Sequence, residues 1–128
     1  MRIGINMFCP KCHGKFDHVQ TPIGVIERCR SCGGLWFDVL EHVDHKVIAK
    51  AIDTGDKELG ALYNDTRDIH CPVCVNTRML KMTDSAQTHI QFESCPGCHG
   101  RFYDAGEFAD FAQLTISDIL KRVGILKK

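Results

Sequence analysis

The sequence has no long apolar run and no surplus of charge of either sign. Its 128 residues contain no stretch that approaches the roughly 20 apolar residues needed to span a membrane. The first six residues also lack the apolar stretch of a signal peptide. We therefore expect a cytoplasmic protein without a membrane segment, where thiols stay reduced and metal ligation is favoured over disulfide bonds.

The sequence disfavours two classes of function, one because of its charge and one because of the motifs it lacks. Sixteen Lys and Arg match sixteen Asp and Glu, and eight thiolates binding two divalent ions would bring the formal charge to about −4. This charge disfavours nonspecific binding to nucleic acid, which depends on a positive field. The sequence also lacks a nucleophile–base arrangement, a phosphate-binding loop and a paired-carboxylate motif, so we expect neither an enzyme nor a small-molecule substrate.

The chain has eight cysteines, and all of them fall in four C-x-x-C pairs. The eight candidate metal ligands are Cys9, Cys12, Cys29, Cys32, Cys71, Cys74, Cys95 and Cys98. Two consecutive pairs separated by a hairpin-sized spacer are typical of a four-thiolate zinc ribbon, so we expect two Zn²⁺ ions, one in each ribbon. An interleaved arrangement, in which pairs from the two ribbons share a metal, is the alternative. A closed four-cysteine site has no open position for water and is structural rather than catalytic.

The two cysteine sets divide the chain into modules that are too small to fold around an apolar core alone. Units of about 30 residues need a metal, a disulfide or a partner. We expect a first zinc ribbon with a capped helix over residues 1–52, a connector with a short helix over 53–69, and a second ribbon with a C-terminal helix over 70–128.

The fold class expected from these patterns is a small metal-stabilised α+β protein made of two tandem zinc ribbons. Each ribbon is a β-hairpin with two cysteine-bearing turns, or knuckles, followed by an amphipathic helix. The expected strands cover residues 15–19 and 23–28 in the first ribbon, and 79–82 and 88–93 in the second.

Three helices are expected. The first covers residues 39–52, with an apolar face made of Leu40, Val43, Val47, Ile48 and Ala51. The second covers residues 57–64, and the third follows Asp104.

The repeat is longer than the cysteine pattern alone. Trp36-Phe37-Asp38-x-x-Glu41 follows the first cysteine set, and Phe102-Tyr103-Asp104-x-x-Glu107 follows the second at the same distance. Each acid–x–x–Glu segment has the spacing of a helix-capping box. We expect the aromatic pair to close over its own ribbon and to bury the first turn of the helix.

This extended unit resembles a bacterial and phage family of zinc-ribbon domains named after the zinc-binding region of transcription factor IIB. The family pattern is C-P-x-C, a hairpin, and then C-x-x-C-x-G-x-W-[FL]-D-x-x-E. Besides its cysteines, the first copy matches at Gly34, Trp36, Phe37, Asp38 and Glu41. The second copy matches at Gly100, Tyr103, Asp104 and Glu107, with Phe102 in place of the Trp. The resemblance covers residues 8–42 and 70–108 and implies zinc binding, whereas the family name does not establish a role in transcription.

The histidines offer weaker candidates for metal ligands. His13 and His99 each follow a ligand cysteine and could replace a neighbour, although four thiolates already complete each site. His42 and His45 lie near Asp38 and Glu41 on the expected first helix. A second metal site there lacks a third firm ligand, so we favour a solvated helix face.

Three functional hypotheses follow. The first is an adaptor that binds another protein or itself, because the third helix is richer in apolar side chains than one ribbon needs: Phe108, Phe111, Leu114, Ile119 and Leu120. These side chains would pack between the copies or onto a partner. The second is a nucleic-acid-binding or transcription-associated module that uses Lys11, Lys15, Arg28, Arg30 and Arg101. The third is a thiol redox or metal-handling switch.

Overall fold

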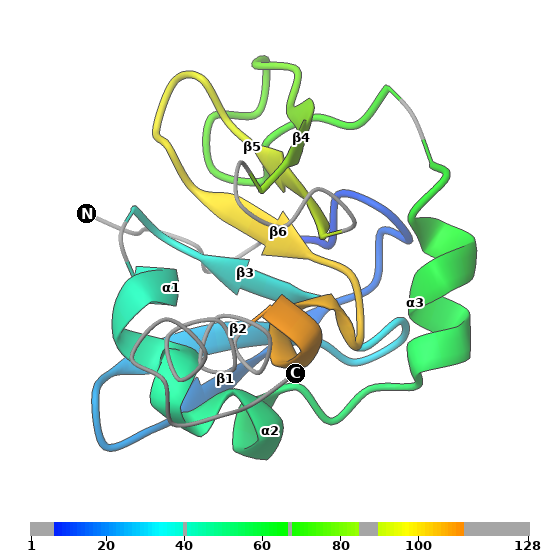
Figure 1. The fold of residues 1–128 in the computed structure, drawn as a ribbon. Coiled ribbons are helices and arrows are strands. Elements are labelled where there is room, and N and C mark those ends of the chain that lie inside the picture. Colours follow the sequence, from blue (N-terminus) through cyan, green and yellow to red (C-terminus); the bar gives the residue numbers. More distant parts are fainter. Residues whose placement is uncertain (1–6, 40, 67, 85–89, 112–128) are drawn as a thin grey trace.

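The computed structural model of the chain describes residues 7–39, 41–66, 68–84 and 90–111 (Figure 1). The first repeat forms strands β1 (Phe16–Gln20), β2 (Val25–Cys29) and β3 (Leu35–Phe37). The second forms β4 (Leu80–Thr83), β5 (Gln91–Ser94) and β6 (Arg101–Tyr103). The four hairpin strands predicted from the sequence are confirmed with shifted ends, although residues 88 and 89 lie outside the described ranges.

The six strands form one antiparallel sheet in the order β1-β2-β3-β6-β5-β4. The two repeats meet in the middle, where Trp36 of β3 lies opposite Phe102 of β6. The aromatic segments therefore do not simply close over their own ribbons, as the sequence suggested. They are the third strand of each ribbon, and each covers the edge of the other. The unit boundaries given above stay a prediction, and the two repeats share one sheet.

The strand register places equivalent side chains symmetrically about this central pair. One row of directly opposed residues crosses all six strands: His18, Glu27, Trp36, Phe102, Glu93 and Lys81. Directly opposed residues in an antiparallel sheet share a face. The row therefore reads base, acid, aromatic, aromatic, acid, base, and it reveals an approximate two-fold relation between the repeats.

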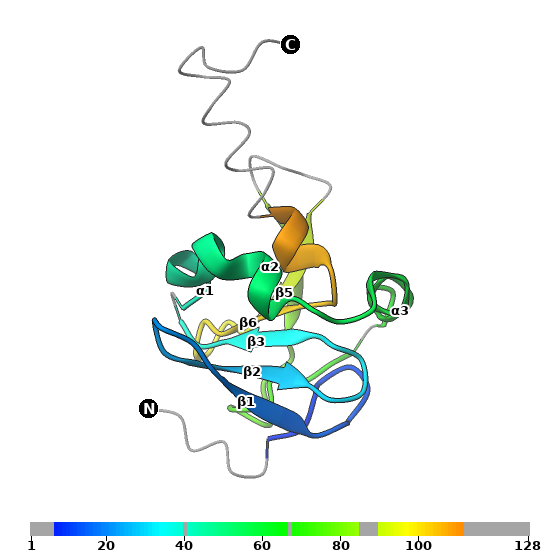
Figure 2. The ribbon, with the colours of Figure 1, turned by 90° about the horizontal axis from the view of Figure 1, so that it is seen from below.

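Each face of the sheet carries its own core. On one face, Trp36 and Phe102 pack with both cysteine sets and with Phe16, Ile69 and Met79. On the other face, Phe37 and Tyr103 pack beneath the helices that follow each ribbon. Figure 2 shows α1 and α2 together on this second side of the sheet. Alternation along a strand puts neighbouring aromatic residues on opposite faces, so each aromatic pair contributes to both cores.

The helix predicted over residues 39–52 is broken into α1 (Glu41–Asp44), a 3-10 turn (His45–Ile48) and α2 (Ala49–Ile52). The predicted apolar face is wrong at Val43, Val47 and Ala51, although Ile48 does pack against the core. Val43 is 49% exposed and Val47 80% exposed, while the buried positions are His42, His45, Ala49 and Ile52. Their spacing of three, four and three residues is itself helical. Leu40 lies outside the described residues.

The start of this segment explains which side faces the sheet. The Glu41 carboxylate accepts a hydrogen bond from the Asp38 amide at 2.9 Å, so the glutamate half of the predicted capping box is confirmed. The Glu41 amide donates to the backbone carbonyl of Asp38 at 3.0 Å. The His45 ring then donates from Nδ1 to the Glu41 carbonyl at 2.8 Å, and its Nε2 lies 2.9 Å from the Thr21 hydroxyl in the β1–β2 turn. These bonds hold His45 against the sheet, and the predicted solvated histidine face is therefore also wrong.

The connector joins the two repeats through its backbone and its carboxylates. Helix α3 (Lys57–Tyr63) confirms the predicted short helix, and Asp56 caps it by accepting from the Glu58 amide at 2.9 Å. Asp53 accepts hydrogen bonds from the amides of Gly106 and Ala109, both at 2.9 Å. Residues 107–111 are helical, so Asp53 caps the helix of the second repeat from the connector.

The predicted packing of aromatic side chains between the copies is confirmed for Phe108, and Phe111 joins the same core through a ring of its own repeat. The rings of Phe37 and Phe108 lie 4.6 Å apart between centroids, and those of Tyr103 and Phe111 lie 6.0 Å apart. Leu114, Ile119 and Leu120 lie outside the described residues. Within the described part of the chain, no helix has both the length and the apolar character that crossing a membrane requires.

Candidate metal centres

Four cysteine knuckles share one local conformation. The residue after the second cysteine of each pair has a left-handed φ: 63° at His13, 77° at Gly33, 67° at Val75 and 63° at His99. This turn directs backbone amides toward sulfur. In the first knuckle, for example, Lys11 donates to the Cys9 sulfur at 3.4 Å, and in the third Val73 donates to Cys71 at 3.4 Å. Such bonds stabilise thiolates, which are the form that binds metal.

The hairpins bring the knuckles together within each repeat. The Sγ atoms of Cys9, Cys12, Cys29 and Cys32 form one cluster, and those of Cys71, Cys74, Cys95 and Cys98 form another, with all sulfur atoms of a cluster within 4.8 Å of one another. The sulfur atoms of Cys12 and Cys29 lie 3.3 Å apart, and those of Cys71 and Cys98 lie 3.7 Å apart. A tetrahedral zinc ion with bonds of about 2.3 Å separates its sulfur ligands by about 3.8 Å. The predicted pairing within each repeat is confirmed, and the interleaved arrangement is not formed.

The thiol environment fits a divalent cation. Hydrogen bonding from the neighbouring thiols of Cys29 and Cys32 raises the pKa of Cys9, and burial raises the pKa of Cys71. Hydrogen bonds from the thiols of Cys32 and Cys9 instead lower the pKa of Cys29. Four thiols this close cannot all ionise unless a cation compensates their charge. Zinc binding therefore releases protons and joins the hairpin to its knuckles, so the two four-cysteine groups hold two Zn²⁺ ions, one in each ribbon.

The histidines do not join these clusters. Among the described residues, every group of three or more potential metal ligands consists of cysteines alone. His13 and His99 are exposed, and they occupy the left-handed turn position instead of a ligand position. His45 uses both ring nitrogens in hydrogen bonds, and His42 is buried with it. The alternative metal site at these two histidines is therefore not formed in the described part of the chain.

The glycine of the family pattern has a specific partner in the other repeat. A Cβ atom on Gly34 would lie 2.1 Å from the Phe102 ring, and a Cβ atom on Gly100 would lie 2.3 Å from the Trp36 ring. Each aromatic ring therefore rests on the backbone beside the other metal site. The glycine and the ring of each G-x-W or G-x-F motif both contact the other repeat, so the motif is explained only when the two repeats are paired.

Two buried glutamates lie on the same face of the sheet as the cysteine clusters, and the sequence did not predict their burial. Glu27 is fully buried and its carboxylate lies 3.0 Å from the His18 ring. In the second repeat, Glu93 contacts Lys81 at 2.8 Å and Lys11 at 2.9 Å. Alternation along the strands places both glutamates on the cysteine face, but only the central pairing of the repeats explains why that face is covered.

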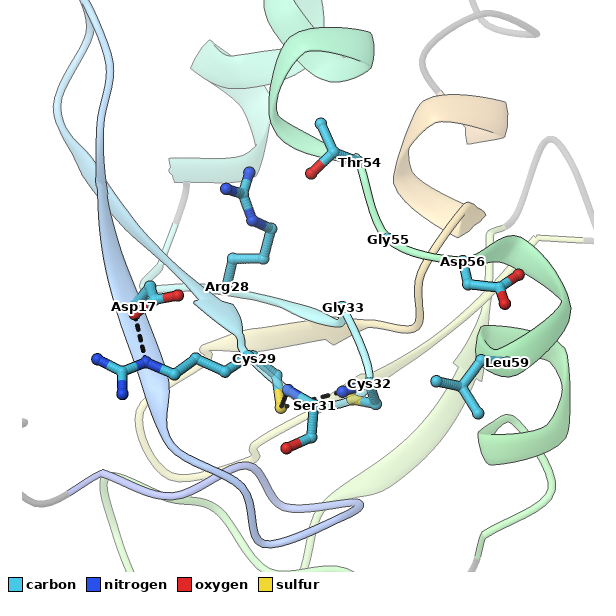
Figure 3. Close-up of a pocket in the computed structure, with 11 residues that line it drawn as sticks. Asp17, Arg28, Cys29, Ser31, Cys32, Gly33, Thr54, Gly55, Asp56 and Leu59 are labelled. Atoms are coloured by element: carbon cyan, nitrogen blue, oxygen red, sulfur yellow. Dashed lines mark hydrogen bonds and ion pairs between the residues drawn. The ribbon is translucent and has the colours of Figure 1, made fainter.

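A cavity of about 270 Å³ adjoins the second knuckle of the first ribbon (Figure 3). It extends from Cys29 and Cys32 to Leu59 of α3. Asp17 and Asp56 in its lining balance the charges of Arg28 and Arg30. Arg30 pairs with Asp17 at 2.5 Å, and Arg28 donates to the Ile52 carbonyl at 2.9 Å. The hollow is therefore a poor site for an anion.

The transcription factor zinc-finger family matches the chain at residues 8–44 and 70–113, which together make up more than half of it. Neither the curated proteins nor the solved structures compared with the chain include a match. The two matched segments contain one four-cysteine cluster each. The chain belongs to the transcription factor zinc-finger family, and it carries two tandem zinc ribbons.

Proposed function

We propose that the protein is a zinc-stabilised adaptor that binds another protein through one groove. The groove lies between the first knuckle of each repeat, Cys9–Cys12 and Cys71–Cys74. This knuckle groove has a volume of about 420 Å³. It is lined by Phe8, Cys9, Pro10, Lys11, His13, Thr66, Asp68, Ile69, His70, Cys71, Pro72 and Val75. Its apolar walls suit an apolar side chain of a partner polypeptide, and the zinc sites hold both walls in place.

Two features of the knuckle groove support a binding role. Phe8 is 48% exposed and Val75 is 65% exposed, so the groove presents apolar surface to solvent. Val75 also has a left-handed φ of 67°, which is unfavourable for a β-branched residue. Such strain is found at functional sites, where surrounding structure maintains it. An exposed valine at this turn gives the groove apolar surface that a glycine would not.

The basic residues that favoured nucleic acid are largely engaged within the protein. Lys11 is buried, Arg28 binds the Ile52 carbonyl and Arg30 pairs with Asp17. The Arg101 guanidinium stacks over the Phe92 ring at 4.2 Å. Contacts of this kind leave few of these cations for a phosphate backbone, which supports the adaptor over the nucleic-acid-binding alternative.

We propose a binding rather than a catalytic role, since a closed four-thiolate site has no open coordination position. A redox or metal-handling switch stays a prediction. Burial of Cys9, Cys29 and Cys32 argues for slow attack on the first site. Rapid zinc release under mild peroxide would instead favour the switch.

Affinity capture with the zinc-loaded protein tests the adaptor role. Phe8→Glu and Val75→Glu should each lose the captured partner, because a charge in the knuckle groove opposes apolar contact. Val47→Glu is the matched control, since Val47 is 80% exposed on the opposite face of the sheet. A partner retained by both groove variants, or a mobility shift with DNA or RNA that weakens steeply with salt, would contradict the proposal. Sedimentation of the purified chain identifies self-association as the alternative occupant.

A further inference from the structure

A buried cation joins the first metal site to the second repeat. The Lys11 side chain is fully buried, and its ammonium group lies 2.9 Å from Glu93 and 3.0 Å from Asp104. It also donates to the Tyr63 carbonyl at the end of α3, at 2.8 Å. Lys11 belongs to the first ribbon, while both carboxylates belong to the second. If Lys11 is lost, Glu93 keeps its contact with Lys81 at 2.8 Å, whereas Asp104 loses its contacting cation. A buried carboxylate in that position is strongly destabilising, because its charge is left without compensation.

The approximate symmetry of the repeats shows that this contact is made in one direction only. Val73 occupies the position in the second ribbon that Lys11 occupies in the first. Asp38, the counterpart of Asp104, instead accepts a hydrogen bond from the Trp36 indole at 3.1 Å. Phe102, the counterpart of Trp36, has no such donor. The two repeats thus satisfy equivalent aspartates differently: the first uses its own indole, and the second depends on a lysine from the first.

The position of Lys11 depends on the first knuckle. Lys11 lies between the ligands Cys9 and Cys12, and its backbone amide donates to the Cys9 sulfur at 3.4 Å. Metal binding and folding are one process in such a turn. Loss of the metal would therefore release the backbone that holds the lysine over the two carboxylates.

We propose that Lys11 makes the stability of the second ribbon dependent on metal at the first. Asp104 also accepts the Glu107 amide through its backbone carbonyl at 3.0 Å, at the start of the helical residues 107–111. Release of Lys11 would thus disturb β5, the end of β6 and this helix together. The coupling rests on zinc binding and on these contacts, and it does not depend on the adaptor role.

A thermodynamic cycle on the full chain tests this coupling. The zinc affinity of the second site is measured by competition with a chromophoric chelator in the wild type, Cys12→Ser, Lys11→Met and the double variant. Cys12→Ser disables only the first site. It should weaken the second site about fivefold or more when Lys11 is present, and much less in the Lys11→Met background. An equal effect in both backgrounds would overturn the proposal.

Val73→Met is the matched control. Together with Cys74→Ser it should show no comparable coupling toward the first site, because Val73 carries no charge to a carboxylate. If Cys12→Ser leaves the second site too weak to measure, hydrogen exchange of the zinc-loaded chain decides. Lys11→Met should accelerate exchange in β5 more than Val73→Met accelerates it in β2, and equal acceleration would overturn the proposal. Phe102→Trp should partly restore protection to Lys11→Met by giving Asp104 the indole donor that Asp38 has.

Discussion

The contact between each aromatic ring and the glycine of the other repeat makes a sharp stability prediction for Gly100→Ala. The new Cβ would lie 2.3 Å from the Trp36 ring, whereas carbon atoms in contact need about 3.5 Å or more. The ring would have to move by more than about 1 Å. Trp36 lies on β3 in the central strand pair and is fully buried. Movement of its ring therefore separates β3 from β6 or displaces the Cys95–Cys98 knuckle. Overpacking of a core costs about 1–3 kcal/mol, and we expect Gly100→Ala to lower the free energy of unfolding by about 3 kcal/mol.

Urea unfolding of the zinc-loaded protein measures this loss, and Trp36, the one tryptophan of the chain, provides the fluorescence signal. Val47→Ala is the control, because Val47 is 80% exposed. The control should change the free energy of unfolding by less than about 0.5 kcal/mol. Trp36→Phe should recover part of the loss in Gly100→Ala by removing the six-membered ring that the methyl group meets. Because this double variant lacks the only tryptophan, its unfolding is followed by circular dichroism. If Gly100→Ala is as stable as Val47→Ala, the two repeats do not pack through these glycines.

Three further predictions concern metal, pH and backbone strain. Chelation should abolish the circular dichroism of the fold, and Cys32→Ser or Cys98→Ser should each unfold its own ribbon, since metal binding supplies folding free energy; an unchanged spectrum after chelation would contradict this. Burial raises the pKa of Asp104 to about 6. In the unfolded state the same carboxyl has its ordinary pKa of about 3.9, so it is already deprotonated at pH 5. Stability should fall by about 1 kcal/mol between about pH 5 and 7 through this residue, and urea unfolding of Asp104→Asn should lack that part of the slope. Val75→Gly should raise the free energy of unfolding by about 1 kcal/mol by relieving the left-handed turn, whereas a lower value would show that Val75 is not strained.

The metal sites could be predicted because their information is local. Each cysteine pair is a short turn motif, and a hairpin of ordinary length can bring two such turns together. Prolines at positions 10 and 72 and the spacing of the cysteines therefore specify the ligands without knowledge of the rest of the fold. The hairpin strands followed for the same reason.

The central pairing of the repeats could not be predicted in the same way. Strands β3 and β6 have three residues each, and their paired residues are 64 to 68 positions apart in sequence. Such short segments carry no clear alternation, and nothing local indicates which edge they cover. The repeat of G-x-W and G-x-F was the available signal, because a glycine two residues from a large ring can mark close packing by a neighbour.

The charged core also escaped the sequence analysis. Glu27 and Glu93 alternate with apolar residues, so a half-exposed strand is the ordinary expectation. They are buried because the other repeat and the knuckles cover their face of the sheet. The histidine face of α1 and α2 was misassigned for a related reason, since Val43 and Val47 are more apolar than His42 and His45. Hydrogen bonds from His45, and not hydropathy, decide which side packs inward.

The two copies need each other for a physical reason that zinc alone does not supply. Zinc can close a hairpin, but it leaves the outer edge of the third strand open and the aromatic ring of that strand without a surface to cover it. In this chain β3 and β6 close each other's edges, and Trp36 and Phe102 rest on each other's glycines. The replacement of one indole by Phe102 is matched by Lys11, which supplies Asp104 with the partner that the ring no longer provides. Because this compensation crosses between repeats, replacing the first copy with another second copy would leave a buried aspartate without its cation. The tandem arrangement therefore forms a single asymmetric unit of folding, built on two zinc sites of the same design.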